Sequence, residues 1–382
     1  MVIFNGFAIF FIRKNDYSKS LSYIFYFFTL NNLIYSQDSI VVQMSMQHIE
    51  SIDSVFAQRV ELKKSFMFIY GEYHDYEKTN ELANNLFFKT TAYKNEKKIY
   101  FIEGGASIGY IIDKYNHNHD FLHYKWGTTL PIDKQNLLKN TAINLKKIFL
   151  KDTTVKFISF DCELLSGWPL ICFYDIIKNS DKDEIFKLEI NYFERKFSFF
   201  NSNKKLRKAS DFFIRAFIND SLKYKSNISN ENFYYYREII RGLKTGLLID
   251  SLKNAMKTYY EKAELRESHL YDNITNNIDK YKPDFVFIHT GLLHSLDTFL
   301  YFPNKSPWVS VSERLSARYG KEKITKLGLI RLSDIGKYNY TIYNREIIEK
   351  MEMIAPLNDK FINLEFIKPY IKTKFDYAIF IE

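Results

Sequence analysis

The chain has 382 residues, a formal net charge of +9 and an aromatic fraction of 18%. This length is enough for one large domain or two smaller ones. The lysines and arginines are spread along the chain without an arginine-rich block, which argues against nucleic-acid binding, because that function concentrates basic residues on one face. The cysteines, Cys162 and Cys172, are not the closely spaced pairs of a metal framework.

The first 36 residues have the pattern of a secretory signal peptide. Arg13, Lys14 and Lys19 precede an apolar run from Leu21 to Ile34, and Ser36 stands before a polar start. A membrane span needs about 20 apolar residues, and this run is shorter. We therefore expect an exported protein, periplasmic or secreted, that is cleaved near Ser36. The alternative is an uncleaved N-terminal anchor, through which the protein would be attached to a membrane.

The first predicted strand of the remaining chain ends in ionisable side chains. Phe66 to Tyr70 is a short apolar run followed by Gly71-Glu72-Tyr73-His74-Asp75, and a helix is predicted over 77–88. In open α/β sheets, a strand, a turn and a helix in this order place a site outside the carboxyl end of the strand. Glu72 and His74 are therefore candidate site residues.

Three further apolar runs predict strands over 98–102, 155–160 and 284–288. The ends of these strands carry Glu103, then either Asp161 or Glu163, then His289, with His294 one turn further on. Helices predicted over 108–115 and 133–150 separate the strands. This alternation predicts an α/β fold with a mainly parallel sheet flanked by helices. The carboxyl ends of parallel strands meet at one edge of a sheet, so these side chains should lie together.

Residues 167–282 contain no convincing strand pattern. Helices rich in Phe and Tyr are predicted over 184–200, 205–224 and 232–280. We expect a large helical insertion that covers the C-terminal strand ends, within a single α/β domain over 37–382. In its last part, Arg266, Leu270 and Asn273 share one helix face, because they are spaced at i, i+4 and i+7. Most aromatic side chains should form a core; a lid over an apolar ligand is the alternative.

Four short motifs resemble those of a known superfamily, in the same order. They are Gly71-Glu72-Tyr73-His74, Glu103-Gly104, Arg266-Glu267 with Leu270 and Asn273, and Gly291-Leu292-Leu293-His294. The set is similar to the G-E-x-H superfamily that joins ChaN-type haem-uptake proteins, Tiki-type metalloproteases and erythromycin esterases, over about residues 66–332. One residue separates the glutamate from the histidine, as in the ChaN and Tiki branches, whereas the large helical insertion resembles the esterase branch.

The candidate site residues are thus His74, Glu72, Glu103, Arg266, His289 and His294. His74 is the expected general base for water attack, because its ordinary pKa lies near neutrality. Glu72 or Glu103 would hold it, and Arg266 with a late histidine would stabilise the oxyanion. The resemblance to erythromycin esterases implies the same chemistry on an ester or lactone-type bond. Neither cysteine lies beside a histidine in the sequence, so a covalent nucleophile is not expected.

Two alternatives use the same residues. His74, His294 and a carboxylate could hold a divalent metal ion that activates water, as the resemblance to Tiki-type proteases implies. The resemblance to ChaN implies a non-catalytic protein that binds haem or another apolar ligand. The first hypothesis needs no cofactor. Its partner would be a small-molecule substrate of partly apolar character, not a nucleic acid.

Overall fold

The structure is a computed structural model, and it describes residues 2–4, 7–9, 43, 49–50, 65–74, 78–91, 97–117, 132–163, 166–180, 182–196, 202–252, 256–296, 298–299, 308–331, 361–363 and 376–381. The chain divides into two compact units, one comprising 1–51, 330–373 and 379–382, the other 52–329 and 374–378. The single domain expected over 37–382 stays a prediction. So does the signal segment, most of which lies outside the described residues.

The described strands of the first unit form antiparallel pairs. β1 (Val2–Phe4) pairs with β2 (Phe7–Ile9), and β3 (Ile49–Glu50) pairs with β11 (Phe361–Asn363). Among the described residues of the whole chain, no helix is long and apolar enough to cross a membrane.

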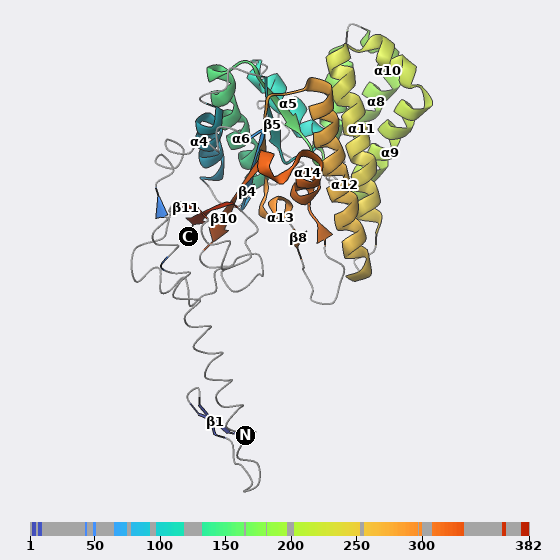
Figure 1. Cartoon of the computed structure of the whole chain (residues 1–382). Helices are drawn as coiled ribbons and strands as arrows, with labels where there is room; N and C mark the ends of the chain where they lie inside the picture. The colour runs from blue at the N-terminus through green and yellow to red at the C-terminus, as the bar shows by residue number, and fades with distance from the viewer. Residues whose placement is uncertain are drawn as a thin grey trace. The chain divides into compact units, whose positions relative to one another are not determined.

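A parallel sheet forms the centre of the second unit (Figure 1). Its strands are β4 (Met67–Glu72), β5 (Lys98–Ile102), β6 (Val155–Ser159), β7 (Phe285–Gly291) and β10 (Ile324–Arg331). They lie in the order β10-β4-β7-β5-β6, and each neighbouring pair is parallel. Ile102 pairs with His289, and Glu72 with Gly291, so the carboxyl ends of these strands meet at one edge. The predicted α/β fold with a parallel sheet is confirmed.

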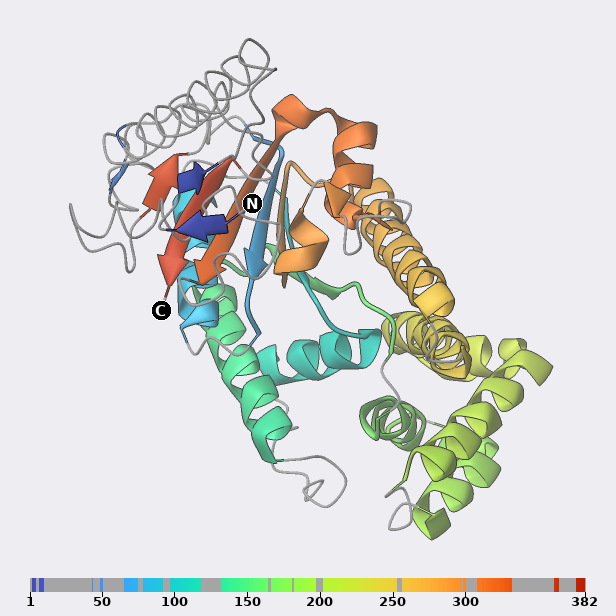
Figure 2. The ribbon, with the colours of Figure 1, turned by 90° about the horizontal axis from the view of Figure 1, so that it is seen from below.

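The sheet is covered on both faces, which explains the apolar runs within its strands. Every residue of β4, β5 and β7 is buried. On one face, Phe87 of helix α4 (Thr79–Thr91) packs against Tyr100 and Phe287, with ring centroids 5.3 and 5.6 Å apart. The opposite face packs against helices α12 (Met256–Tyr281) and α14 (Val311–Tyr319), seen beside the strands in Figure 2.

This unit contains several further helices and strands. They are α5 (Ala106–Asn116), α6 (Ile132–Lys151), α13 (Leu292–Ser295), the antiparallel pair β8 (Thr298–Phe299) and β9 (Trp308–Val309), and the 3-10 turn η4 (Lys321–Lys323). The last strand of the chain, β12 (Tyr377–Ile381), begins after Asp376, whose backbone N–H donates to the carbonyl of Lys326 in β10.

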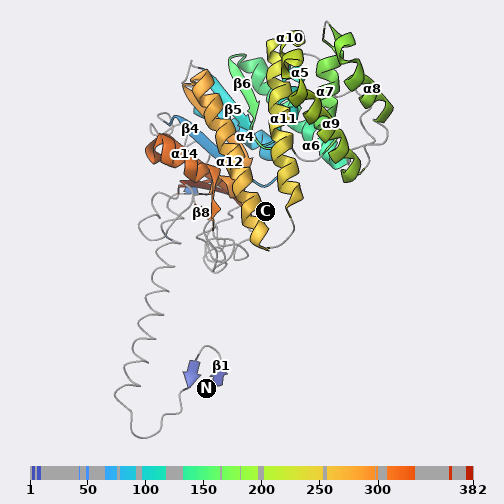
Figure 3. The ribbon, with the colours of Figure 1, turned by 90° about the vertical axis from the view of Figure 1, so that its right-hand side faces the viewer.

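The expected helical insertion is present, because every described residue between 166 and 282 lies in a helix, a turn or a short connection. Its elements are α7 (Trp168–Lys178), η2 (Asp183–Phe186), α8 (Lys187–Lys196), α9 (Asn203–Asn219), α10 (Ser221–Asn227), α11 (Asn230–Ser251) and α12 (Figure 3). One helix was predicted over 232–280, whereas the structure has two. The first, α11, ends at Ser251, and Leu252 after it has extended backbone. Aromatic side chains form the core of this insertion, as in the contact of Phe173 with Tyr236.

The loop after β6 carries a buried carboxyl group, Glu163, which joins the sheet to the insertion. The backbone N–H and the hydroxyl of Ser107 each donate to it at 2.7 Å. A Cβ at Gly246 of α11 would lie 2.0 Å from the Glu163 carbonyl oxygen, so glycine is required there for the helix to approach the loop. Burial raises the pKa of Glu163 to about 7, against the lowering effect of the Ser107 hydrogen bonds.

This buried carboxyl should make stability depend on pH. Since its pKa is higher in the folded than in the unfolded protein, its contribution is complete below its ordinary value of 4.5 and is lost as pH rises through about 7. Glu163→Gln keeps the shape and cannot ionise. We expect it to match the wild type at pH 5 and to exceed it by up to about 3 kcal/mol at pH 8.5 in urea unfolding.

The matched control is Glu264→Gln, which changes an exposed carboxylate that pairs with Arg314. Its effect should be small and similar at both pH values, because exposed ion pairs contribute little. A Glu163→Gln protein that is equally destabilised at pH 5 and pH 8.5 would show that Glu163 is ionised in the folded protein.

Candidate active site

Glu72 and His74 are placed at the carboxyl end of β4, where the strand leaves the sheet. Glu72 is buried, and its Oε1 lies 2.9 Å from Nδ1 of His74, which has 58% of its side chain exposed. The other oxygen of Glu72 accepts a hydrogen bond from Thr79 at the start of α4. The carboxylate therefore fixes the orientation of an exposed imidazole ring.

His289, at the end of β7, lies behind Glu72. Its Nε2 is 3.0 Å from Glu72 Oε2, off the line of a good hydrogen bond, and its Nδ1 is 3.1 Å from the hydroxyl of Tyr100. The ring is buried. His289 therefore contacts Glu72 from the interior and does not face a substrate.

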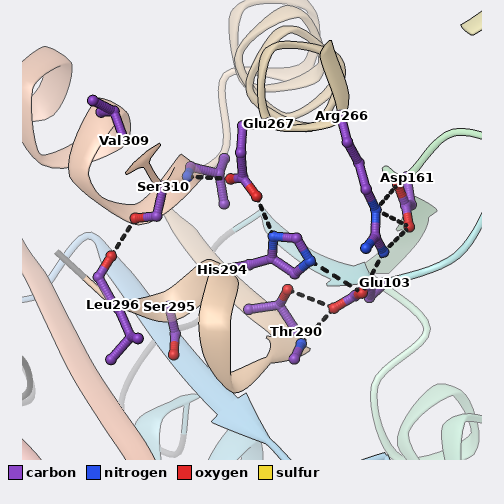
Figure 4. A network of polar contacts seen from close by, with 12 residues as sticks. Glu103, Asp161, Arg266, Glu267, Thr290, His294, Ser295, Leu296, Val309 and Ser310 are labelled. Carbon is purple, nitrogen blue, oxygen red and sulfur yellow. Dashed lines mark hydrogen bonds and ion pairs between the residues drawn. The ribbon is translucent and has the colours of Figure 1, made fainter. Parts of the chain in front are cut away.

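Glu103, immediately after β5, is the centre of the site (Figure 4). Its Oε2 accepts hydrogen bonds from the Thr290 hydroxyl at 2.8 Å and from the Gly291 backbone N–H. Its Oε1 lies 3.6 Å from Nε2 of His74 and 3.5 Å from Nε2 of His294. A Cβ at Gly291 would lie 3.0 Å from His74 Nε2, so glycine leaves the space in which His74 approaches Glu103.

Arg266 reaches this centre from α12 and joins two buried carboxylates. Its Nη2 donates to Glu103 Oε1 at 2.8 Å, and its Nε lies 3.1 and 3.2 Å from the two carboxylate oxygens of Asp161. Its side chain is 35% exposed. Nη1 makes no hydrogen bond to any residue that the structure describes. The guanidinium thus retains a donor for a ligand.

His294 on α13 is buried and held at both ring nitrogens. Its Nδ1 contacts Glu267, the residue next to Arg266 on α12, and its Nε2 faces Glu103. Glu267 is fully buried, and its second oxygen accepts the Val311 N–H at 2.6 Å, at the start of α14. Glu267 was not among the predicted site residues, although its position inside the Arg266 motif could have indicated it.

The sequence left Asp161 and Glu163 as alternatives for the third acidic strand end. The structure places Asp161 at the site, where it pairs with Arg266, and Glu163 against Ser107. Asp161 lies two residues after the end of β6, and Glu163 lies two residues further along the loop.

The charges of the cluster stabilise one another. The neighbouring carboxylates of Glu103 and Glu72 raise the pKa of His74 to about 10. Burial disfavours the charged form of Glu103, but His294, His74 and Arg266 outweigh it and hold the pKa of this carboxyl well below its usual range. Burial also opposes protonation of His294, yet Glu267 and Glu103 raise its pKa. At neutral pH, His74 therefore carries a proton beside ionised carboxylates, and the carboxylates beside His294 favour the protonated form of that ring.

Exposure separates the candidate residues into two groups. Among them, His74 and Arg266 have side chains open to solvent, whereas the other four are buried: Glu72, Glu103, His289 and His294. A substrate would therefore meet an imidazole that can exchange a proton and a guanidinium that can donate to an anionic oxygen. The buried residues set the position and charge of these two groups.

The metal ion of the alternative hypothesis would be held by His74, His294 and a carboxylate of this cluster. Among the described residues, no group of three or more His, Cys, Asp or Glu side chains is arranged to hold a metal ion. Nε2 of His74 and Nε2 of His294 both face Glu103 Oε1 at the distances of ion pairs, and their Nδ1 atoms contact Glu72 and Glu267. A metal ion bound to Nε2 of both rings would replace their ion pairs with Glu103, whereas the Nδ1 contacts could remain.

Comparison with solved structures shows the fold. A Bacillus cereus protein from a structural genomics programme matches with a TM-score of 0.56 and 11% identity, over 90% of this chain and 97% of that chain. A mutant of the erythromycin esterase EreC in its open conformation matches with a TM-score of 0.52 and 13% identity, over 87% and 94%. The chain thus shares its fold with an erythromycin esterase, as the resemblance of the motifs implied.

A structure of ChaN from Campylobacter jejuni with cofacial haem matches over 74% of this chain and 86% of that chain, at 11% identity and a TM-score of 0.32, too low to inform the comparison. No family model matches the sequence. A search of curated proteins likewise finds no match.

Proposed function

We propose that the protein is a hydrolase that cleaves an ester or lactone-type bond by attack of a water molecule. The observation that carries the proposal is the exposed His74 ring, held by Glu72 and Glu103 beside the free donor of Arg266. A histidine oriented by a carboxylate and placed near an oxyanion donor is a recurring arrangement in acyl transfer. The shared fold with an erythromycin esterase supports the choice of bond.

The reaction would proceed through one tetrahedral intermediate. Neutral His74 takes a proton from water as the water oxygen bonds to the carbonyl carbon, and Arg266 Nη1 donates to the resulting oxyanion. The carbon–oxygen bond to the leaving alcohol then breaks, and His74 returns the proton to that oxygen. The products are a carboxylic acid and an alcohol. Glu72 and Glu103 would stabilise the protonated form of His74 between the two steps.

The pH dependence of hydrolysis tests this role of His74. Since its pKa is raised to about 10, the neutral form that accepts a proton is a minor one at pH 7, and its fraction grows as pH rises. We expect kcat/KM for an aryl ester such as p-nitrophenyl butyrate to increase between pH 6 and pH 9. Glu72→Gln removes one carboxylate from His74, so its rising limb should lie at lower pH.

The matched control is Asp279→Asn, which changes a carboxylate of α12 that pairs with the exposed Arg318. Its pH–rate profile should coincide with that of the wild type. A Glu72→Gln profile that also coincides with the wild type would contradict the assignment of His74 as the base, since its titration must respond to Glu72.

We propose in addition that the protein is exported. The support is the sequence pattern of residues 1–36, in which three basic residues precede an apolar run. The expected mature N-terminus is near Gln37, in a periplasmic or secreted fraction. N-terminal sequencing of protein recovered from cell fractions tests this, and an intact Met1 on cytoplasmic protein would refute it.

A further inference from the structure

A second cavity lies between the edge strand β6 and the helices α11 and α12 of the insertion. It has room for a water-sized group, and Ser159, Asn273, Tyr234 and Tyr235 are among the residues that line it. Asp161 lines it as well, and the same Asp161 holds Arg266 at the proposed active site. The cavity therefore adjoins that site through one carboxylate.

Two polar atoms of the lining residues have no hydrogen-bond partner among the described residues: Asn273 Oδ1 and Ser159 Oγ. Asn273 is only 7% exposed, and its Nδ2 donates to the Phe160 carbonyl oxygen at 2.7 Å. Because Phe160 offers an acceptor, the nitrogen of the amide must face it, and the oxygen is left over. A buried polar atom without a partner costs about 1–3 kcal/mol, so a group that satisfies both atoms would be bound favourably.

The other polar groups of the lining are already satisfied. The Tyr234 hydroxyl donates to Asn277 Oδ1 at 3.0 Å, and Asn277 Nδ2 donates to the Asn273 carbonyl at 2.8 Å. Glu238 pairs with Arg237 and Arg241, and the Lys156 ammonium lies over the Tyr281 ring. Asp161 is paired to Arg266, so both carboxylates of the lining are paired with arginines, which disfavours a cationic ligand.

We propose that this cavity is a subsite for a hydroxyl group of the substrate, so that the substrate is an ester or lactone of a neutral, hydroxylated molecule. A hydroxyl group can donate to Asn273 Oδ1 and accept from Ser159 Oγ, whereas a group that only accepts cannot satisfy Asn273 Oδ1. The rings of Tyr234 and Tyr235 supply apolar surface for the carbon skeleton. The link to an ester rests on the proposed function; binding of the hydroxylated part does not.

Binding of a neutral polyol tests the subsite without requiring hydrolysis. The probe is myo-inositol, measured by saturation-transfer NMR and titration calorimetry on the full-length protein, with glucuronate as the charged comparison. We expect millimolar binding of inositol and weaker binding of glucuronate. Ser159→Ala should weaken inositol binding about 3- to 10-fold, the value of one neutral hydrogen bond, without lowering Tm, because its hydroxyl has no partner among the described residues.

The matched control is Ser210→Ala, which also removes a buried hydroxyl without a described partner, but in the core of the insertion. Its inositol binding should equal that of the wild type. A second variant, Gly109→Ala, adds a methyl group 3.2 Å from Ser159 Oγ and should abolish binding by filling the cavity.

Absence of inositol binding, or equal binding by wild type, Ser159→Ala and Gly109→Ala, would overturn the subsite and leave a cavity that holds water only. The outcomes also separate the two proposals. Inositol binding by a protein that hydrolyses no ester would retain the subsite and reject the proposed function. Ester hydrolysis without inositol binding would retain the proposed function and reject the subsite.

Discussion

Replacement of His74 by alanine is expected to lower kcat/KM for ester hydrolysis by about 10²- to 10⁴-fold, the usual contribution of a general base. The loss follows because, of the two site residues open to solvent, His74 alone can accept a proton. The fold should remain intact, since an exposed ring at a strand end fills no core space. Circular dichroism and Tm would establish this while the rate is measured on p-nitrophenyl butyrate.

His117→Ala is the matched control for this variant. His117 is 56% exposed, as His74 is 58% exposed, and it lies beside a single carboxylate, Asp113, at the end of α5. Its loss should leave kcat/KM unchanged. If His74→Ala retained full activity with an intact fold, His74 would serve only to neutralise Glu72 and Glu103.

Replacement of Arg266 by lysine is expected to be nearly as damaging, although the charge is kept. Lysine has no planar fork, so it cannot bind Asp161 and Glu103 at once and still present a donor to an oxyanion. Loss of one oxyanion donor typically lowers kcat by about 10²- to 10³-fold. Stability should also fall, by about 1.5–3 kcal/mol, because a charged hydrogen bond to a buried carboxylate is lost.

Arg318→Lys provides the comparison. Arg318 makes the same forked contact, to Asp279, but both side chains are exposed. Its replacement should change neither kcat nor stability appreciably, since exposed ion pairs contribute little. An Arg266→Lys protein with normal kcat and a raised KM would show that Arg266 binds the substrate equally in the ground and transition states.

The sequence predicted the strands because they are buried on both faces. β4, β5 and β7 each contain an unbroken apolar run, over 67–70, 99–102 and 285–288, and each run ends near the point where the chain leaves the sheet. The positions of Glu72 and Glu103 followed from the same rule, since residues at the carboxyl ends of neighbouring parallel strands must meet. Parallel pairing of β4 and β5 with β7 brings the side chains of these strand ends together.

The sequence pattern could not show which site side chains are buried or which carboxylates they contact. His289 and His294 were expected to face the reaction, yet both are enclosed and contact carboxylates from the interior. Glu267 was missed because a glutamate inside a helix is usually solvated, and only packing against α13 and α14 shows that it is buried. The break between α11 and α12 was also missed, because both flanks have the same helical composition.

The raised pKa of His74 could not be anticipated either. An isolated histidine titrates near neutrality, but the pKa here depends on two carboxylates from different strands, 31 positions apart in the sequence. Only the fold brings Glu72 and Glu103 to the same ring. The consequence is a base that is mostly protonated at pH 7, so the site would favour alkaline conditions.

The central claim is that water is activated by His74, and metal-depleted protein tests it most directly. The protein would be dialysed against a chelator, its metal content measured by mass spectrometry, and hydrolysis of p-nitrophenyl butyrate followed before and after for wild type and His74→Ala. We predict that metal-depleted wild type keeps its full kcat/KM and that His74→Ala loses it. Activity that disappears with the metal and returns in proportion to added Zn²⁺ would contradict this account.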